Sequence, residues 1–248
     1  MPPLPPIIRL DTVGSTNQYA EMLLSAGEIT ESTVIWALEQ TAGKGLGENT
    51  WESEPGKNLT FSVVLFPHFL HPSRQFQLNK AVSLGVLDCV KSILPGQPCR
   101  LKWPNDIYAG SRKLGGILIR HIVSGEEISS TIAGIGLNIN QEQFGSDLPN
   151  PVSVKQLLGR ELDLEYSLHQ LLAGLGKRYD DLRSGDEITL DRDYNENLLG
   201  FGHWSRFSSA GKELEGMISG VDDSGRLLLQ TRDEKIIASS HGELNLLV

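Results

Sequence analysis

The 248-residue sequence is poor in cysteine and has no long apolar run, and both shortages exclude classes of protein. Its two cysteines, Cys89 and Cys99, lack the spacing of a metal-binding motif, so we expect reduced thiols with a structural role. No stretch reaches the roughly 18 consecutive apolar residues that indicate a membrane-spanning helix. The first ten residues, MPPLPPIIRL, lack the charged and apolar regions of a secretion signal. We therefore expect a cytoplasmic protein without membrane association.

Basic residues are in the minority as well. Lysine and arginine number 22 against 31 aspartates and glutamates, which gives a formal net charge of -9 and a pI near 5.2. This balance argues against a broad surface for DNA or another polyanion, so any positive site must be local. Hydrophobic residues make up 39% and charged residues 21%, which is typical of an ordinary globular protein.

The hydrophobic pattern predicts an α/β (α+β) fold. Apolar runs predict strands at residues 7–10, 33–38, 59–66, 101–103, 114–123 and 129–140. Helical spacing predicts helices at residues 74–93, 154–158 and 167–182, and another that is capped by Ser15 or Thr16. Residues 104–111 and 124–127 are expected to be turns between adjacent strands. Together these elements predict a mixed, largely antiparallel sheet flanked by helices.

The pattern changes at about residue 201. Short β-rich runs follow, at residues 205–208, 214–221, 227–231 and 235–239. Their spacing predicts a small C-terminal β-barrel. We therefore expect a catalytic domain of residues 1–200 and a barrel domain of residues 201–248, a division that the chain length allows.

Residues 101–120, LKWPNDIYAGSRKLGGILIR, carry the densest group of polar side chains. Lys102 and Lys113 can face phosphate or carboxylate oxygens, and Asp106 can hold a divalent cation. Asn105 offers the donor and acceptor that an adenine edge requires. The alternative is ordinary hairpin chemistry, with Trp103 in the core and Lys113 on a solvated edge. These residues alone leave both interpretations open.

Four segments together resemble the biotin protein ligases. They are DTVGSTNQYA at 11–20, EQTAGKGLGENTWESEPGKNLTFS at 39–62, KWPND with RKLGGIL at 102–106 and 112–118, and AGIGLNIN at 133–140. The resemblance implies a class II synthetase-like biotin/lipoate ligase catalytic domain with a C-terminal β domain. Some members of this family carry an N-terminal winged helix for DNA. Only ten residues precede the first motif here, so we expect no DNA-binding domain.

The resemblance also implies the activity. ATP would activate biotin as biotinyl-5'-AMP, and the biotinyl group would pass to a lysine of a biotin carboxyl carrier protein domain. The first step joins two anions and requires cations, with Mg²⁺ as the expected ion, while the second needs no covalent enzyme intermediate. A homodimer through an exposed strand edge such as residues 129–136 is one expectation, and a monomer is equally allowed.

The family motifs assign roles to individual residues. Catalytic roles fall to Lys113, Lys102 and Asp106, and Asp106 is also the expected metal ligand. Biotin contacts are implied for Ser15, Thr16, Asn17, Gln40, Gly45, Leu46, Trp51, Lys113, Gly115, Gly116 and Leu118. Nucleotide contacts are implied for Lys44, Lys102, Trp103, Asn105, Lys113, Gly136 and Asn138. The paired glycines could instead mark a bulge or a close backbone crossing, and Ser15 or Thr16 could merely cap the helix.

The glycine-rich loop departs from the family at Leu46, where an arginine is common. We expect Lys44 or Lys57 to replace that cation in part; a leaky intermediate is the other outcome. Such a loop is expected to be mobile when empty and to close on its ligand. Two alternative functions stay open: a lipoate or octanoate ligase with the same fold, and a non-catalytic protein that binds biotinyl-AMP.

Overall fold

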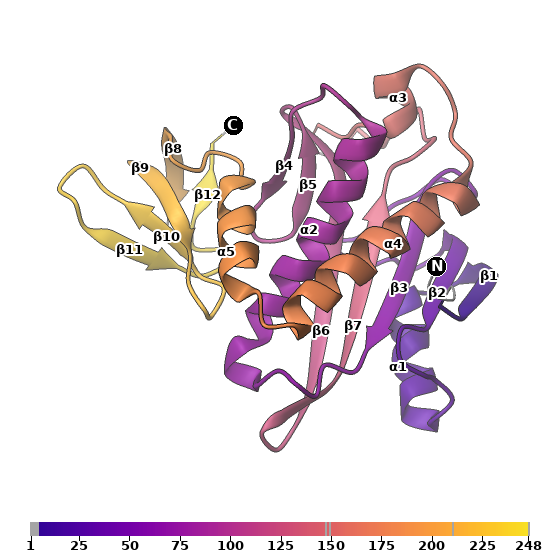
Figure 1. Ribbon diagram of the computed structural model, residues 1–248. Helices are drawn as coiled ribbons and strands as arrows, with labels where there is room; N and C mark the ends of the chain where they lie inside the picture. The colour runs from indigo at the N-terminus through magenta and orange to yellow at the C-terminus, as the bar shows by residue number, and fades with distance from the viewer. Residues whose placement is uncertain (1–4, 147, 149, 210, 248) are drawn as a thin grey trace.

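A mixed sheet of seven strands forms the larger part of the protein (Figure 1). The computed structural model describes residues 5–146, 148, 150–209 and 211–247. The strands are β1 (Ile7–Val13), β2 (Val34–Gln40), β3 (Leu59–Leu65), β4 (Cys99–Lys102), β5 (Asp106–Ala109), β6 (Arg112–Ser124) and β7 (Glu127–Leu137). They lie in the order β1-β2-β3-β7-β6-β5-β4, and β1 is parallel to β2 whereas the other pairs are antiparallel. The predicted fold class is confirmed.

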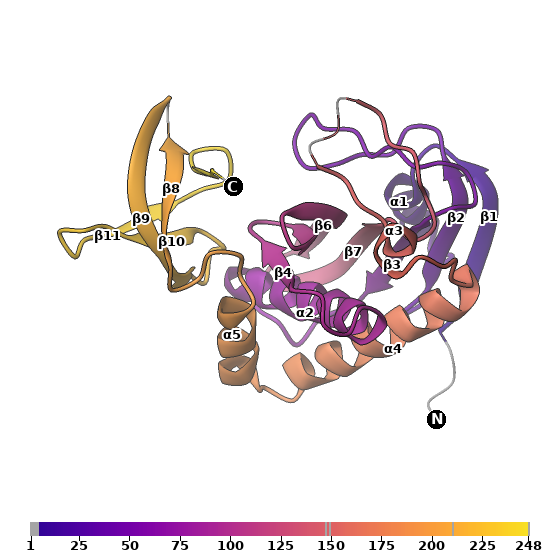
Figure 2. The same cartoon turned by 90° about the horizontal axis from the view of Figure 1, so that it is seen from above.

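Helices cover both faces of this sheet. They are α1 (Thr16–Ala26), α2 (Gln75–Ile93), α3 (Val154–Leu158), α4 (Leu164–Arg183) and α5 (Glu187–Glu196), with a 3₁₀ turn η1 (Pro72–Arg74) before α2. Figure 2 shows α2 and α4 on one side of the sheet and α1 on the other. Because side chains alternate along a strand, Phe61, Ile117 and Ile135 share the α2 face, and Ser62, Leu118 and Gly134 share the α1 face.

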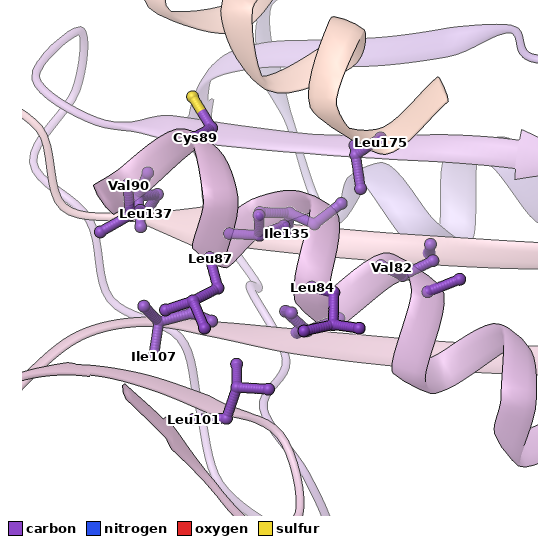
Figure 3. Close-up of a cluster of buried hydrophobic side chains, with 14 of the residues drawn as sticks. Val82, Leu84, Leu87, Cys89, Val90, Leu101, Ile107, Ile135, Leu137 and Leu175 are labelled. Carbon is purple, nitrogen blue, oxygen red and sulfur yellow. The ribbon is translucent and has the colours of Figure 1, made fainter. Parts of the chain in front are cut away.

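The main core lies between α2 and the sheet. Helix α2 is buried along most of its length because the sheet and α4 enclose it. In Figure 3, Leu84 and Leu87 of α2 lie toward Leu101 of β4 and Ile107 of β5. Each of these four side chains is at most 3% exposed. Complete burial of one leucine or isoleucine contributes about 1.5–3 kcal/mol, so this layer is a principal source of stability.

Several features differ from the prediction. Residues 104–111 were expected to be a turn, which is wrong, because β5 occupies Asp106–Ala109 within them. Strand β5 has four residues between two turn signals, too few for the alternation to be recognised. Helix α5 was not predicted, since Leu190 and Tyr194 are its only buried residues. The prediction that residues 129–136 offer a free edge is also wrong for residues 131–136, because β7 pairs there with β3 and β6.

A second, smaller sheet follows α5. Its strands are β8 (Trp204–Ser209), β9 (Lys212–Val221), β10 (Leu227–Gln230), β11 (Ile236–Ser239) and β12 (Asn245–Leu246). They form one antiparallel sheet in the order β11-β10-β9-β8-β12, and the described residues show no ladder between β11 and β12 that would close a barrel. The Trp103 indole N–H, from the turn after β4, donates to the Gly225 carbonyl at 3.0 Å. This bond joins the two sheets.

The described part of the chain contains no helix that is both long and apolar enough to cross a membrane. Cys89 on α2 and Cys99 on β4 are both buried free thiols. Burial raises the pKa of the Cys89 thiol to about 11, with a smaller contribution from the neighbouring Asp88 carboxylate. The thiolate is the reactive form of cysteine, so this shift fits the structural role that we expected.

His121 links the sheet to α2. One ring nitrogen lies 2.9 Å from Thr131 Oγ1 on β7, and the other lies 2.9 Å from Asn79 Oδ1 on α2. Burial lowers the pKa of the His121 imidazole to about 4, because desolvation disfavours the charged ring. The unfolded chain therefore takes up this proton at a higher pH than the folded protein does.

We predict that His121 makes the protein sensitive to acid. Its contribution to stability is complete above about pH 6.5, the unfolded value, and is lost as the pH falls toward 4, to a limit of about 3 kcal/mol. The His121→Gln variant should show a shallower loss of unfolding free energy between pH 6.5 and 4, measured by urea denaturation. The exposed His203, changed to Gln, is the control and should retain the wild-type slope; equal slopes in all three proteins would refute the assignment.

Candidate active site

A cavity of about 730 Å³ lies on the α1 face of the larger sheet and reaches the smaller sheet. Its floor is hollow because Gly116, Gly134 and Gly136 share this face; Gly116 pairs with Gly136, and Gly134 with Leu118. The space above two of them is filled. An added Cβ at Gly134 would lie 2.3 Å from Asn17 Oδ1, and one at Gly136 would lie 2.4 Å from Trp51 Cε2. An added Cβ at Gly116 would come no nearer than 3.5 Å to another atom, so a methyl group fits there at ordinary contact distance.

Lys113 points into this cavity because of a bulge. The register of β5 against β6 shifts between Ile107 and Tyr108, so that Asp106 pairs with Gly116 but Tyr108 pairs with Lys113. The shift reverses the alternation along β6, which is a known effect of bulges. Leu114 is therefore fully buried in the core, while Lys113 Nζ lies 2.7 Å from Asp106 Oδ1 beside the cavity. The ion pair holds both side chains in place.

A polar end of the cavity is formed by Thr16, Asn17 and Gln40, with Ser62 behind them. Thr16 begins α1, and both its backbone N–H (2.8 Å) and its Oγ1 (3.1 Å) reach Gln40 Oε1 at the end of β2. Asn17 Nδ2 donates to the Leu118 carbonyl at 3.1 Å. Ser15 is the N-cap residue and also lines the cavity, but its side chain makes no capping hydrogen bond. The polar end is thus organised by α1, β2 and β3.

The glycine-rich segment 43–51 forms a small hairpin. Gly45 N–H donates to the Asn49 carbonyl at 2.8 Å, and Trp51 N–H donates to the Gly43 carbonyl at 3.0 Å. Leu46 is half-buried and lines the cavity, as does the exposed Lys44. The Trp51 indole lies over the glycine floor, and its buried Nε1–H finds no acceptor among the described residues. The hairpin therefore covers one side of the cavity.

Lys102 and Asn105 from the 101–120 segment, and Asn138 directly after β7, also border the cavity. Lys102 Nζ lies 3.3 Å from the Tyr108 hydroxyl and 5.0 Å from the centre of its ring. Asn105 Nδ2 donates to the Ile117 carbonyl at 3.0 Å, and Asn138 Nδ2 donates to the Val152 carbonyl at 3.1 Å. Both amides have a backbone partner, so each already has a structural role.

The structure brings together every predicted site residue except Gly115. Gly115 does not line the cavity: an added Cβ would lie 2.6 Å from the Gly136 carbonyl oxygen. Its surroundings are those of the alternative, a close backbone crossing, and its contact with biotin stays a prediction. Lys57, one of two suggested replacements for the arginine, does not line the cavity either, and its Nζ lies 3.9 Å from Glu161 Oε1. Lys44 is the cation of the loop that reaches the site.

Several residues of the site were not predicted. Ser62 is the last residue of the 39–62 motif and had no predicted role, because no sequence pattern shows that its Oγ lies behind the polar end. The smaller sheet contributes lining residues from far along the chain: Ile218, Leu227, His241, Leu244 and Leu246. His241 approaches Trp103, with ring centres 6.2 Å apart. Only the docking of the two sheets places these residues at the cavity, so no local signal could reveal them.

The fold and the cavity define a protein with a large mixed sheet, whose polar cavity is bordered by a second, smaller β-sheet. The sequence profile of the Biotin/lipoate A/B protein ligase family matches residues 10–140, which is more than half of the chain. That of the Biotin protein ligase C terminal domain matches residues 206–243. The chain belongs to the Biotin/lipoate A/B protein ligase family, and the second match places it among the biotin protein ligases, as the motifs indicated.

Relatives and solved structures agree with this placement. The chain is 30% identical over 232 residues to the bifunctional ligase/repressor BirA of Bacillus spizizenii, covering 92% of this chain and 70% of that protein. It is 29% identical over 240 residues to a biotin–acetyl-CoA-carboxylase ligase of Mycobacterium tuberculosis, covering 94% and 87%. A mutant biotin protein ligase from Aquifex aeolicus, solved in complex with biotin, has a TM-score of 0.77 and 25% identity, covering 98% of each chain.

The two adjacent glycines of β6 should respond differently to substitution. In Gly115→Ala the new methyl group meets the Gly136 carbonyl, so we expect a loss of about 1–3 kcal/mol in unfolding free energy. In Gly116→Ala the methyl group enters the cavity at ordinary contact distances, so stability should change by less than about 1 kcal/mol. Urea denaturation of both variants measures the difference. Equal losses would contradict the structural role of Gly115.

Proposed function

We propose that this protein uses ATP to activate biotin and then transfers the biotinyl group to a lysine of a biotin carboxyl carrier protein domain, with AMP and pyrophosphate as products. Family membership supports this activity. The observation that carries the assignment of residues is the Lys113–Asp106 pair at 2.7 Å, inside the cavity that ends in Thr16, Asn17 and Gln40. A cation and a hydrogen-bonding end within one cavity match the two ends of biotin.

The cavity suggests how biotin is oriented. The fused rings lie over Gly116, beside Leu118, Trp51 and Gly45, with the ureido group at the polar end and the carboxylate toward Lys113. An unpaired ureido group in an apolar site would cost several kcal/mol, roughly 2–7 by transfer measurements, so polar partners there are essential. The nucleotide then lies on the side of Lys102, Asn105 and Asn138, with Lys44 and Trp103 at its margin.

Adenylation follows from this placement. A carboxylate oxygen of biotin attacks the α-phosphorus of ATP, the bond to the β-phosphate oxygen breaks, and pyrophosphate leaves with the bonding electrons. Lys113 contacts both the carboxylate and the α-phosphate and offsets the charge that brings two anions together. Lys102 neutralises phosphate oxygens. Because Lys113 lies on β6 and is paired with Asp106, its position is defined before substrates arrive.

Magnesium is part of the proposal. Mg²⁺ usually binds through one or two carboxylates together with substrate phosphates, and it supplies charge neutralisation when bound. Asp106 fits this pattern as a single carboxylate beside the cavity. Among the described residues no three His, Cys, Asp or Glu side chains gather into a metal-binding cluster, so the phosphates would provide most ligands. Asp106 would hold the ion together with the phosphates while it also pairs with Lys113.

Transfer is the second step. The neutral amine of the carrier lysine attacks the carboxyl carbon of biotinyl-AMP, AMP leaves with the bonding electrons, and the amine proton passes to solvent. An amide C–N bond replaces the mixed anhydride. Leu46 and Lys44 border the intermediate until the carrier arrives, and Lys44 supplies part of the positive charge that an arginine provides in relatives. We further propose a cytoplasmic enzyme with a catalytic domain of residues 1–200 and a C-terminal domain of residues 201–248.

Pyrophosphate release tests the proposal. Purified protein with ATP and Mg²⁺ should release pyrophosphate when biotin is added, and Lys113→Ala should lower kcat by roughly 100-fold or more, the loss expected for one charge-stabilising group. The affinity for biotin, measured by calorimetry without ATP, should fall much less. Lys113 is expected to act chiefly in the transition state, which explains the difference.

Lys177→Ala is the matched control, because this exposed lysine of α4 does not line the cavity. It should leave the rate unchanged. Lipoate replaces biotin in a parallel reaction, since the family includes both kinds of ligase. Release with lipoate but not with biotin would reverse the substrate assignment. Binding of biotin without any release would instead indicate a non-catalytic binding protein.

A further inference from the structure

Ser62 lies at the centre of a chain of oxygen atoms behind the polar end of the cavity. It is fully buried on β3, and its Oγ lies 2.7 Å from Thr16 Oγ1 and 2.6 Å from Asn17 Oδ1. Thr16 Oγ1 lies in turn 3.1 Å from Gln40 Oε1. Ser62 therefore contacts Thr16 and Asn17 directly, and it is linked to Gln40 through Thr16.

Backbone groups fix the orientation of the two side-chain amides in this group of contacts, those of Gln40 and Asn17. Gln40 Oε1 accepts the Thr16 backbone N–H at 2.8 Å, and a backbone N–H can only donate. Asn17 Nδ2 donates to the Leu118 carbonyl at 3.1 Å, which can only accept, so Asn17 Oδ1 faces Ser62. Asn17 reaches this position because Gly134, which pairs with both Ser62 and Leu118, has no side chain.

These oxygen–oxygen contacts outnumber the hydroxyl protons that can fill them. There are three contacts but only two hydroxyl protons, those of Ser62 and Thr16, because the two amide oxygens contribute none. The single Ser62 proton cannot serve Thr16 Oγ1 and Asn17 Oδ1 at once, so one of these two oxygens keeps a lone pair free to accept. An N–H group that enters the cavity from a ligand can donate to that oxygen. The polar end thus favours ligands that donate.

We infer that Ser62 is a positioning residue that holds the Thr16 and Asn17 oxygens ready to accept N–H groups of a cyclic urea. This inference rests on the proposed function, because the biotin ring supplies such donors. A dithiolane ring or a plain alkyl chain has no N–H and leaves the oxygens unpaired. Since a site built for hydrogen bonds strongly rejects an analogue that lacks them, Ser62 contributes to the choice of biotin over lipoate although it lies behind the cavity wall.

The Ser62→Ala variant tests this role, because it removes the hydroxyl and adds no volume. We expect KM for biotin to rise about 10-fold, the equivalent of one neutral hydrogen bond. The values of kcat and of KM for ATP should stay within about twofold, since Ser62 is remote from Lys113 in the proposed orientation of biotin. Calorimetry with biotin alone, without ATP, should show the same loss of affinity.

Thr60→Val is the matched control. Thr60 lies on the same face of β3, is buried, and its Oγ1 donates to the Ala37 carbonyl at 2.8 Å, outside the polar end. This variant should lose a similar amount of stability but keep the wild-type KM for biotin. Equal increases of KM in both variants, or an unchanged KM in Ser62→Ala, would overturn the positioning role. A fall in kcat alone in Ser62→Ala would also do so.

A biotin derivative methylated on a ring nitrogen tests the inference without any substitution in the protein. It should bind wild-type protein more weakly than biotin does, and the difference should shrink in Ser62→Ala. An equal difference in both proteins would show that Ser62 has no part in receiving the N–H group. These binding measurements need no turnover, so their outcome is separable from failure of the proposed activity in the pyrophosphate assay.

Discussion

The close approach of β6 to β7 at Gly115 is the constraint on which the geometry of the site depends. The Gly136 carbonyl leaves no space for a side chain at this position, and the register between β5 and β6 shifts beside it. In a regular strand, Lys113 would share the face of Gly115 and point toward α2. The bulge instead sends Leu114 into the core and Lys113 into the cavity. The bulge beside this crossing thereby places the principal charge.

The alternation of side chains along the strands places the stabilising core on one face of the sheet and the cavity on the other. On the α2 face, Phe61, Ile117 and Ile135 pack beneath α2, and this layer needs large side chains. On the α1 face, the glycines of β6 and β7 leave room that Asn17 and Trp51 enter from other elements. A continuous sheet can therefore hold a rigid core on one side and a cavity on the other. Rigid strands are a more accurate support for a site than loops are.

The parts of this protein that could be predicted are those with a local signal. The 19 residues of α2 repeat their apolar positions over several turns, and the motif residues near Lys113 lie within one hairpin region. Strand β5 was not predicted because four residues are too few to show an alternation. Helix α5 was not predicted because its two buried side chains do not define a helical period. The places of Ser62 and His241 at the site were not predicted for another reason. Their roles arise from contacts between distant segments, which neither composition nor spacing encodes.

The ion pair of Lys113 with Asp106 helps to explain how a protein of negative net charge can bind two anionic substrates. The formal net charge of -9 repels ATP and biotin at long range, so attraction must come from Lys44, Lys102 and Lys113 at the cavity. Asp106 holds the ammonium of Lys113 in place before any substrate binds. An arriving carboxylate or phosphate then meets an oriented cation, not one that must first be ordered, and this preorganisation is what makes a local charge effective in catalysis.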